Sequence, residues 1–488
     1  MKTNKSIINQ SFDAVIIGGG PAGSTCAYKL ASQGHSVLLL EKSQFPRFHI
    51  GESMVPYITK LLEMIGVLDK VKDAKFVKKP GVEFFSKETG DLRRQNFGNL
   101  ADGQNPTSYN FDRARFDKIL LDHANDSGAQ VLQEANVKKL ILDGDRVVGV
   151  EYQHQGKKYE VRAPYVIDAS GRAGIIDKHF HIRKMNKKLE NVVVFQHYKN
   201  VVKENNPAVE GDVIFSAHED GWLWGIPLAN PKKNKVSSER SVFEKFQSFV
   251  DTLLNRKSAE YEVFSVGAVM PKSILKKSNP KKVFDAHCKK APRIKDAIKG
   301  AKPVFRKPKV ESDFCYYSEQ FTGPGYFVIG DAACFVDPVF SGGVFLSMIC
   351  GLKAAEAIDA IFKGKDKDKE CEYFENFCKT GYDTYYRVVY SYYNEFKRDM
   401  NRMGLELPGG FHFVLQTFAG DFWGEPDQPV LSYLRSKEEW NTFEKPFELI
   451  FDCPIYPDVH YKAADIPNLP PLEDFDSISS TEKEEVAV

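Results

Sequence analysis

The sequence predicts an α/β fold with a Rossmann-like domain, and three observations near its start support this. Residues 12–17 form a short apolar run rich in β-branched side chains, which is typical of a buried strand. A glycine-rich turn at 18–23 follows, and residues 24–33 have helical spacing. A second apolar run, 36–40, ends at the acidic Glu41. Strand, glycine turn, helix, and strand with a terminal carboxylate together form the dinucleotide-binding fingerprint.

Each residue of this fingerprint has an expected role at the nucleotide. Gly18 permits the tight turn, Gly20 lets the backbone approach a pyrophosphate, and Gly23 allows close helix–strand packing. Ala22 lies in the same turn, at the helix N-terminus whose amides and partial positive charge favour phosphate. Glu41 is expected to accept hydrogen bonds from a ribose hydroxyl.

Length and composition set the limits of the remaining interpretation. A chain of 488 residues exceeds one growing core, so two or three domains or subdomains are expected. A formal net charge of +1 gives no overall field that would attract nucleic acid or an anionic membrane. Eight scattered cysteines without CxxC spacing and no apolar run of about 18 residues favour a reduced, cytoplasmic protein without a membrane span. His179 and His181 lack partners at ligand spacing, so no metal site is expected.

Three distant segments indicate which dinucleotide is bound. Residues 165–172 and 325–333 each form a strand that enters a turn, and 111–117 read FDRARFD. These segments resemble the flavoprotein monooxygenase superfamily. The resemblance implies that Asp331 binds the ribityl chain of FAD and that Arg113 lies near the cofactor. No second GxGxxG for a tightly held nicotinamide is evident, so the expected cofactor is FAD. Hydroxylases, prenyl reductases and halogenases all belong to this superfamily.

Two further motifs resemble the flavin-dependent halogenases. Residues 45–53, FPRFHIGES, are similar to the segment after their second strand, which implies that Arg47 contacts the cofactor. Residues 221–227 resemble their WxWxIP signature, formed here by Trp222, Trp224, Ile226 and Pro227. The motif is expected to pack against and crowd the flavin. A strand with both tryptophans buried on one face would look the same.

Lys79 is the predicted catalytic residue. It lies in FVKKPGVEF, which resembles the halogenase stretch that holds the active-site lysine, although the adjacent Lys78 leaves the alignment open by one position. The resemblance implies that reduced FAD and O2 form a flavin hydroperoxide that oxidises chloride to hypochlorous acid. The lysine then holds this oxidant, by hydrogen bonding or as a chloramine, beside an aromatic ring. Burial would lower the pKa of the amine and make it more nucleophilic.

Residues 337–344, DPVFSGGV, are the predicted halide loop. Glycines before a helix expose backbone amides that favour an anion, and the resemblance assigns chloride to Gly342 and Gly343 and a flavin contact to Val344. Flavin contact alone, as in hydroxylases, is the alternative. Tryptophan halogenases have a glutamate where Phe340 stands. Its absence favours phenol- or pyrrole-type substrates, because those rings are electron-rich without help.

The predicted organisation is a Rossmann-like FAD-binding domain interleaved with a mixed-sheet substrate domain, followed by a C-terminal helical cap. The boundaries are a disordered 1–11, a core 12–360 with substrate-domain segments 75–110 and 185–320, a cap 361–471 and a disordered acidic tail 472–488. An insertion at 231–263 is interpreted as either a partner contact or a site cover. The tyrosine-rich stripe beginning at Tyr382 is expected to contribute to the core and, in part, to the substrate chamber.

The predicted reaction is FADH2- and O2-dependent chlorination or bromination of a phenolic or polyketide-derived ring. A separate flavin reductase would supply FADH2, and the small aromatic substrate would be free or tethered to a carrier protein. An FAD aromatic hydroxylase or a prenyl reductase is the alternative.

Overall fold

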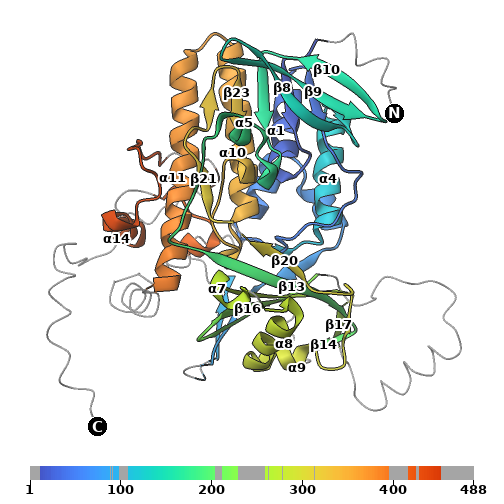
Figure 1. Ribbon diagram of the computed structural model, residues 1–488, viewed down its shortest axis with the longest axis vertical. Helices are drawn as coiled ribbons and strands as arrows, with labels where there is room; N and C mark the ends of the chain where they lie inside the picture. Colours follow the sequence, from blue (N-terminus) through green and yellow to red (C-terminus); the bar gives the residue numbers. More distant parts are fainter. Residues whose placement is uncertain are drawn as a thin grey trace, which may run out of the picture.

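The computed structural model describes residues 11–87, 90, 92–97, 108–203, 211–228, 259–261, 263–276, 278–312, 314–394, 416–424, 428–451 and 455. Figure 1 shows a sheet packed with helices at the top and a second sheet with its own helices below. This mixed α/β architecture confirms the predicted fold class. The predicted insertion lies outside the described residues except for 259–261 and 263, and the predicted tail lies wholly outside them.

The upper part is built on a six-stranded sheet in the order β22-β23-β11-β1-β2-β7, parallel except for the edge pair β22–β23. The four inner strands are short and buried, as the apolar runs predict, whereas the edge strands β7 and β22 are partly exposed. Their bounds are β1 (Ala14–Ile17), β2 (Val37–Leu40), β7 (Gln130–Leu132), β11 (Tyr165–Asp168), β22 (Thr322–Gly323) and β23 (Tyr326–Val328).

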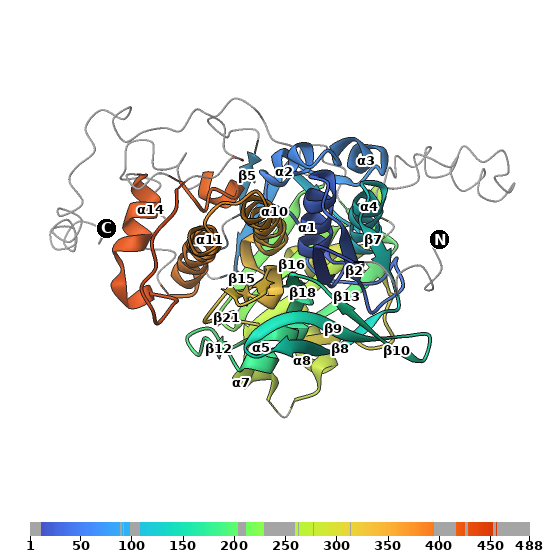
Figure 2. The same cartoon turned by 90° about the horizontal axis from the view of Figure 1, so that it is seen from above.

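Helices pack against this sheet and against each other. Helix α1 (Pro21–Ser32) begins with a proline at its first turn, where no amide partner is needed. It crosses α10 (Gly343–Phe362) so closely that a Cβ on Gly351 would stand 2.4 Å from the Ala22 carbonyl oxygen. Helix α11 (Lys367–Asn394) packs on the other side of α10, and Figure 2 shows α1, α10 and α11 side by side. The remaining helices here are α2 (Ile58–Met64), α3 (Leu68–Asp73), α4 (Arg113–Asp126), α5 (Ile175–Phe180) and α14 (Pro429–Ser436).

The lower part is an eight-stranded mixed sheet in the order β19-β13-β18-β16-β15-β4-β5, with β20 also paired to β13. Its bounds are β4 (Gly81–Ser86), β5 (Leu92–Asn96), β13 (Asn191–Lys199), β15 (Val213–His218), β16 (Gly221–Pro227), β18 (Phe264–Pro271), β19 (Lys302–Pro303) and β20 (Lys309–Ser312). Side chains of β13, β16 and β18 form a second apolar core with α8 (Pro280–Lys290) and α9 (Pro292–Ala297).

Smaller elements complete the described chain. They are the sheet of β8 (Asn136–Asp143), β9 (Arg146–His154) and β10 (Lys157–Arg162); the sheet of β12 (Arg183–Met185), β21 (Tyr316–Ser318) and β24 (Cys334–Phe335); the pairs β3 (Val77–Lys79) with β6 (Ser108–Asn110) and β14 (Val201–Lys203) with β17 (Ala259–Tyr261); and α7 (Lys272–Leu275).

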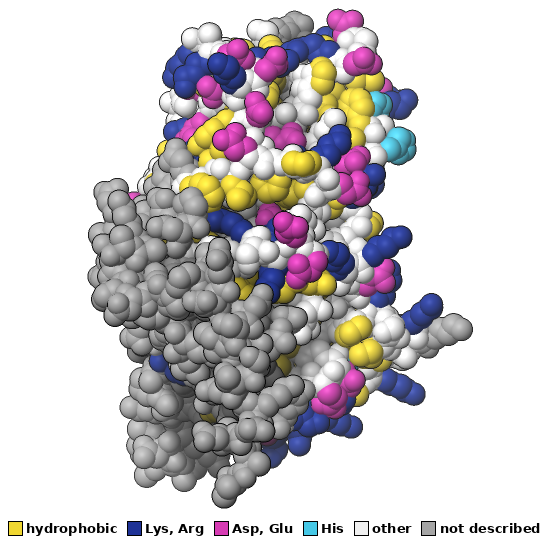
Figure 3. All heavy atoms as spheres, turned by 90° about the vertical axis from the view of Figure 1, so that its left-hand side faces the viewer, with side chains coloured by type: hydrophobic (Ala, Val, Ile, Leu, Met, Phe, Trp, Pro, Cys, Tyr) yellow, Lys and Arg dark blue, Asp and Glu magenta, His cyan; other side chains and the backbone are white. Residues whose placement is uncertain are grey.

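Two observations concern the surface and the membrane. Basic and acidic side chains alternate over the described part of the face in Figure 3, as expected from the near-zero net charge. Within the described ranges, no helix is both long and apolar enough to cross a bilayer.

Candidate functional site

The glycine turn after β1 is closely packed against its neighbours. Gly18 has φ +105°, and a Cβ there would stand 2.3 Å from the Ala169 carbonyl oxygen. A Cβ on Gly23 would stand 2.0 Å from the Gly18 carbonyl oxygen. At Gly20 the nearest atom would be 3.6 Å away, at Arg47 Nη2, so this position alone faces space that a ligand can approach. The packing explains why glycine stands at positions 18 and 23, and approach of a pyrophosphate at Gly20 stays a prediction.

Glu41 lies at the end of β2 and is buried. Its Oε2 accepts a hydrogen bond from the Gly19 amide at 2.7 Å, and its Oε1 accepts one from the Ser43 amide at 2.8 Å. The carboxylate therefore holds the glycine turn against the next loop. Each oxygen keeps a further lone pair, so binding of a ribose hydroxyl remains a prediction.

Arg47 and Arg113 meet at a buried carboxylate that the sequence interpretation had missed. Asp117 accepts hydrogen bonds from Arg113 Nε at 2.7 Å and from Arg47 Nη1 at 3.2 Å. Arg113 Nη1 also donates to the carbonyls of Ile50 and Gly51, at 2.8 and 2.9 Å. The i, i+4 spacing of Arg113 and Asp117 in FDRARFD could have predicted this ion pair from the sequence. Asp117 thus positions both arginines and the segment after residue 49.

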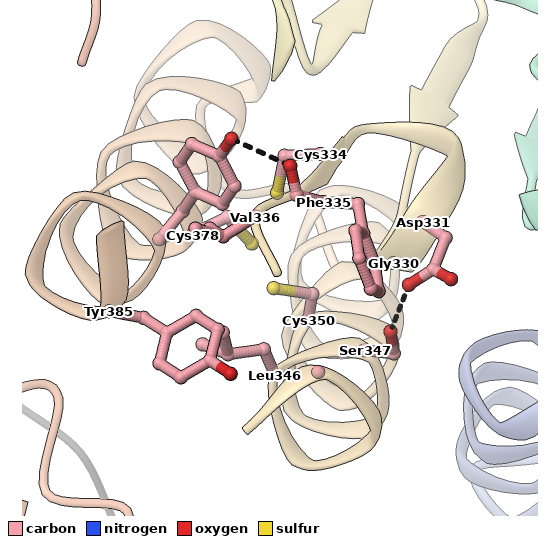
Figure 4. A pocket seen from close by; sticks show the side chains of 12 residues that line it. Gly330, Asp331, Cys334, Phe335, Val336, Leu346, Ser347, Cys350, Cys378 and Tyr385 are labelled. Atoms are coloured by element: carbon pink, nitrogen blue, oxygen red, sulfur yellow. Dashed lines mark hydrogen bonds between the residues drawn. The ribbon is translucent and has the colours of Figure 1, made fainter. Parts of the chain in front are cut away.

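The predicted flavin contacts from distant parts of the chain lie together. A Cβ on Gly51 would be 3.0 Å from Arg113 Nη1 and 3.8 Å from Val344 Cγ2. Asp331 accepts a hydrogen bond from Ser347 Oγ at 3.2 Å (Figure 4). Burial raises the pKa of Asp331 to about 6, against the opposing effect of Arg113. These residues fit an FAD: the start of α1 suits the pyrophosphate, Asp331 the ribityl hydroxyls, and the glycine backbone at 51 a flat ring.

The predicted halide loop has a strained backbone. Phe340 and Ser341 have φ of 63° and 62°, in the left-handed region that disfavours residues other than glycine. The Gly342 amide donates to the Tyr385 hydroxyl at 3.3 Å, and that hydroxyl donates in turn to the Val339 carbonyl. Gly343 opens helix α10, whose first-turn amides have no acceptor within the helix. Tyr385, part of the tyrosine stripe, therefore lies at the predicted halide position.

A buried network joins this loop to the WxWxIP strand. The Asp337 carboxylate accepts hydrogen bonds from the Val339 amide, Asn191 Nδ2 and the Tyr393 hydroxyl, at 3.0 to 3.2 Å. Burial raises the pKa of Asp337 to about 6. Trp222 Nε1 donates to the Tyr393 hydroxyl at 2.8 Å.

The second tryptophan has a packing role. Trp224 covers Gly267 and donates from Nε1 to Ser265 Oγ at 3.1 Å. Ile226 and Pro227 are buried further along β16. Packing within the sheet is therefore enough to explain Trp224. Trp222 also donates a hydrogen bond to the buried network at the halide loop.

Lys79 is buried and its neighbour is not. It is 3% exposed, whereas Lys78 is exposed, because successive side chains of β3 point to opposite faces. Lys79 Nζ donates to the Met54 carbonyl at 2.9 Å and lies 5.1 Å from the centre of the Phe97 ring. Burial lowers the pKa of Lys79 to about 7, and Asp212, which pairs with Arg94, opposes this shift. The geometry therefore favours Lys79 over Lys78.

A row of polar side chains extends from Lys79 toward the predicted flavin site. Ser108 pairs with Lys79 across β3 and β6, and its hydroxyl also donates to the Met54 carbonyl, at 2.6 Å. Asn110 lies two residues along the same face and opposite Ser53. The Ser53 hydroxyl and Asn110 Oδ1 are buried without a hydrogen-bond partner among the described residues. The segment 51–54 links Gly51 to Met54, and an extended segment of this length spans about 10 Å.

This row was not predicted from the sequence, because Ser53 and Asn110 are ordinary polar residues until the β3–β6 pairing brings them to Lys79. No group of three His, Cys, Asp or Glu among the described residues could hold a metal ion.

Comparison with known proteins finds an FAD-binding family model and flavin-dependent halogenases. A family model described as FAD binding domain matches residues 11–379. A flavin-dependent halogenase of Armillaria mellea, armH3, is 32% identical over 400 residues, which are 79% of this chain and 75% of that one. A tryptophan 2-halogenase of Chondromyces crocatus is 28% identical over 390 residues, 78% of this chain and 67% of that one. The solved structure of the flavin-dependent brominase Bmp2 superposes with a TM-score of 0.74 at 26% identity, over 88% of this chain and 98% of that one.

Proposed function

Because this chain belongs to the flavin-dependent halogenase family and is an FAD-dependent oxidoreductase, we propose that it chlorinates or brominates a phenolic or polyketide-derived ring through Lys79. The observation that carries the proposal is the buried amine of Lys79, held by the Met54 carbonyl at one end of a polar row that leads from the predicted flavin site. Family membership favours halogenation over the hydroxylase and prenyl reductase alternatives.

The halide loop has the chemistry to bind an anion. When bound and reduced by a separate flavin reductase, FAD would supply, with O2, the oxidising power needed to convert halide to hypohalous acid. Gly342 and Gly343 offer backbone amides at the start of the 20-residue helix α10, where the helix dipole favours negative charge. The Tyr385 hydroxyl shares the Gly342 amide and would donate its proton to a halide there, in place of the Val339 carbonyl.

The polar row offers the oxidised halogen a route to the amine. Hypohalous acid is a small hydrogen-bonding molecule, and the Ser53 hydroxyl and Asn110 Oδ1 are buried groups with unused hydrogen-bonding capacity. Lys79 lies at the far end. Because its pKa is about 7, an appreciable fraction is the neutral amine at neutral pH, which can form a chloramine, while the protonated fraction donates hydrogen bonds. Lys79 can therefore hold the oxidant either by hydrogen bonding or as a chloramine.

The substrate class is inferred from Phe340. Its ring packs against Phe418, with centroids 4.7 Å apart, and against Tyr392. An apolar side chain at this position cannot assist attack on a ring by electrostatics, so the ring itself must be electron-rich. The match to a tryptophan 2-halogenase makes tryptophan the second candidate substrate.

The test supplies FAD-loaded enzyme with NADH, a flavin reductase, O2 and chloride or bromide, and presents phenols, pyrroles and tryptophan. Halogenated phenol or pyrrole, identified by mass and isotope pattern, is the expected product. Halogenation of tryptophan alone would refute the substrate class. Oxygen consumption with no halogenated product from any compound would refute the reaction.

A further inference from the structure

Three cysteines lie in one cavity behind the predicted halide loop. The cavity, about 20 Å³, is lined by residues that include Gly330, Asp331, Gly343, Ser347 and the three cysteines Cys334, Cys350 and Cys378. Figure 4 shows the sulfur atoms of the three cysteines directed toward one another between α10 and α11. We call these three residues the thiol cluster. A cavity of this size has room for about one water-sized molecule.

Cys334 lies on β24, whereas Cys350 lies on α10 and Cys378 on α11, and each helix also carries residues at the halide loop on the same face. On α10, Gly343, Leu346 and Cys350 are spaced i, i+3 and i+7, so they share one face. On α11, Cys378, Tyr382 and Tyr385 are spaced i, i+4 and i+7 and also share one face. Seven residues of helix rise about 10 Å. Cys350 therefore lies about two helical turns from Gly343 along α10.

The thiols of the cluster are protonated and enclosed, so reaction with them requires a strong oxidant that is produced inside the protein. All three thiols are free. Cys378 lies within side-chain hydrogen-bonding reach of Cys350, and burial raises the pKa of Cys378 and Cys334 well above the usual value. Protonated, enclosed thiols react slowly with ordinary oxidants from solution. Within the described residues no group of three His, Cys, Asp or Glu could hold a metal ion.

We propose, on the basis of the function proposed above, that the thiol cluster is an oxidation site that captures hypohalous acid escaping from the halide loop. The Cys350 sulfur attacks the halogen: an S–X bond forms, the O–X bond breaks, and the leaving hydroxide takes the thiol proton as water. The Cys378 sulfur then attacks Cys350, so the S–S bond forms, the S–X bond breaks, and halide and a proton leave. The halogen gains two electrons and the two sulfurs lose them.

The test uses the full FAD-loaded chain with a flavin reductase, NADH, O2 and bromide, without an aromatic substrate and with catalase to remove hydrogen peroxide. The expected result is a Cys350–Cys378 cross-link in non-reducing peptide mass spectra, with the loss of two hydrogens. Cys288, buried on α8 in the second core, is the internal control and stays reduced. Replacing bromide by nitrate should leave Cys350 and Cys378 reduced.

A parallel reaction with monochlorodimedone, which traps hypohalous acid, separates this inference from the proposed function. Trap halogenation with Cys350 and Cys378 still reduced in the substrate-free reaction overturns the inference and leaves the function standing. Equal cross-linking in nitrate also overturns it, since the oxidant is then not a hypohalous acid. No trap halogenation and no cross-link overturns both. Cys378→Ser should lose the cross-link and leave Cys350 as sulfinate, with trap halogenation unchanged.

Discussion

The glycine turn at the start of α1 and the polar row at Lys79 are built in opposite ways. At the turn, backbone lies against backbone. A Cβ on Gly18 would stand 2.3 Å from a carbonyl oxygen, and a Cβ on Gly23 would stand 2.0 Å from one. Both carboxylate oxygens of Glu41 accept hydrogen bonds from backbone amides. At Lys79, side chains make the site, and the Ser53 hydroxyl and Asn110 Oδ1 are buried without partners among the described residues. The first region has no room for a side chain at Gly18 or Gly23, whereas the second has unused hydrogen-bonding capacity. Substitutions should therefore affect folding at the turn and chemistry at the row.

The largest effect is expected at the turn. Gly23→Ala places a methyl group against the Gly18 carbonyl, so the helix and strand must separate, at a cost of about 3 kcal/mol and with loss of FAD binding. Thermal unfolding and flavin fluorescence titration measure both. The control is Gly20→Ala, where the nearest atom is 3.6 Å away at an arginine side chain. Equal stability of the two variants would contradict the comparison.

Lys79→Ala should reduce halogenation by about 100-fold or more while flavin oxidation and FAD affinity persist, because it removes the group that positions the oxidant. The adjacent Lys78→Ala, on the exposed face, should retain normal activity. Product mass spectrometry and oxygen consumption give the two readouts. Normal chlorination by Lys79→Ala would show that the catalytic amine has been misassigned.

The same lysine predicts an unusual dependence of stability on pH. Its pKa is about 7 in the folded chain and 10.5 ordinarily, so between these values the unfolded chain binds more protons and folding stability rises with pH. Lys79→Met should therefore be more stable than wild type at pH 7. This advantage should shrink by about 1 kcal/mol per pH unit toward pH 10. Denaturant unfolding at several pH values measures it. A constant difference would show that the amine is not shifted.

A smaller effect is expected along the polar row. Ser53→Ala should lower the yield of halogenated product per O2 consumed by about fivefold, because one hydrogen bond to the passing oxidant is lost. The melting temperature should not fall, since the hydroxyl has no hydrogen-bond partner to lose among the residues that the structure describes. Unchanged coupling of O2 consumption to product would remove Ser53 from the route.

The smallest effect is expected at the WxWxIP strand. Trp222→Phe keeps an aromatic ring stacked on Phe215 but loses the hydrogen bond to Tyr393, at a cost of about 1 kcal/mol. The matched change Trp224→Phe removes the bond to Ser265 instead and should cost a similar amount without disturbing the Asp337 network. Halide saturation curves should shift only for Trp222→Phe if that network supports the halide loop.

These two regions also differ in how far they could be predicted from sequence. The turn follows from local backbone geometry, so the order of strand, glycines, helix and carboxylate was sufficient to predict the fold class and Gly18, Gly20 and Gly23. The resemblance to halogenases indicated Lys79 and the halide loop. Asp117, Ser53, Asn110 and Tyr385 were not assigned to the site, because each reaches it through pairing or packing between segments that are far apart in sequence. The arbitration between Lys78 and Lys79 likewise required the pairing of β3 with β6.

The paired lysines of β3 have a consequence for how this enzyme tolerates change. Strand side chains alternate with a period of two, so a one-residue slip of β3 against β6 would normally replace the inward group by one of different chemistry. Here such a slip would exchange Lys78 for Lys79 and still direct an ammonium group inward. A single-residue deletion or insertion just upstream should therefore still leave a lysine at the catalytic position, whereas in most enzymes it would remove the catalytic group.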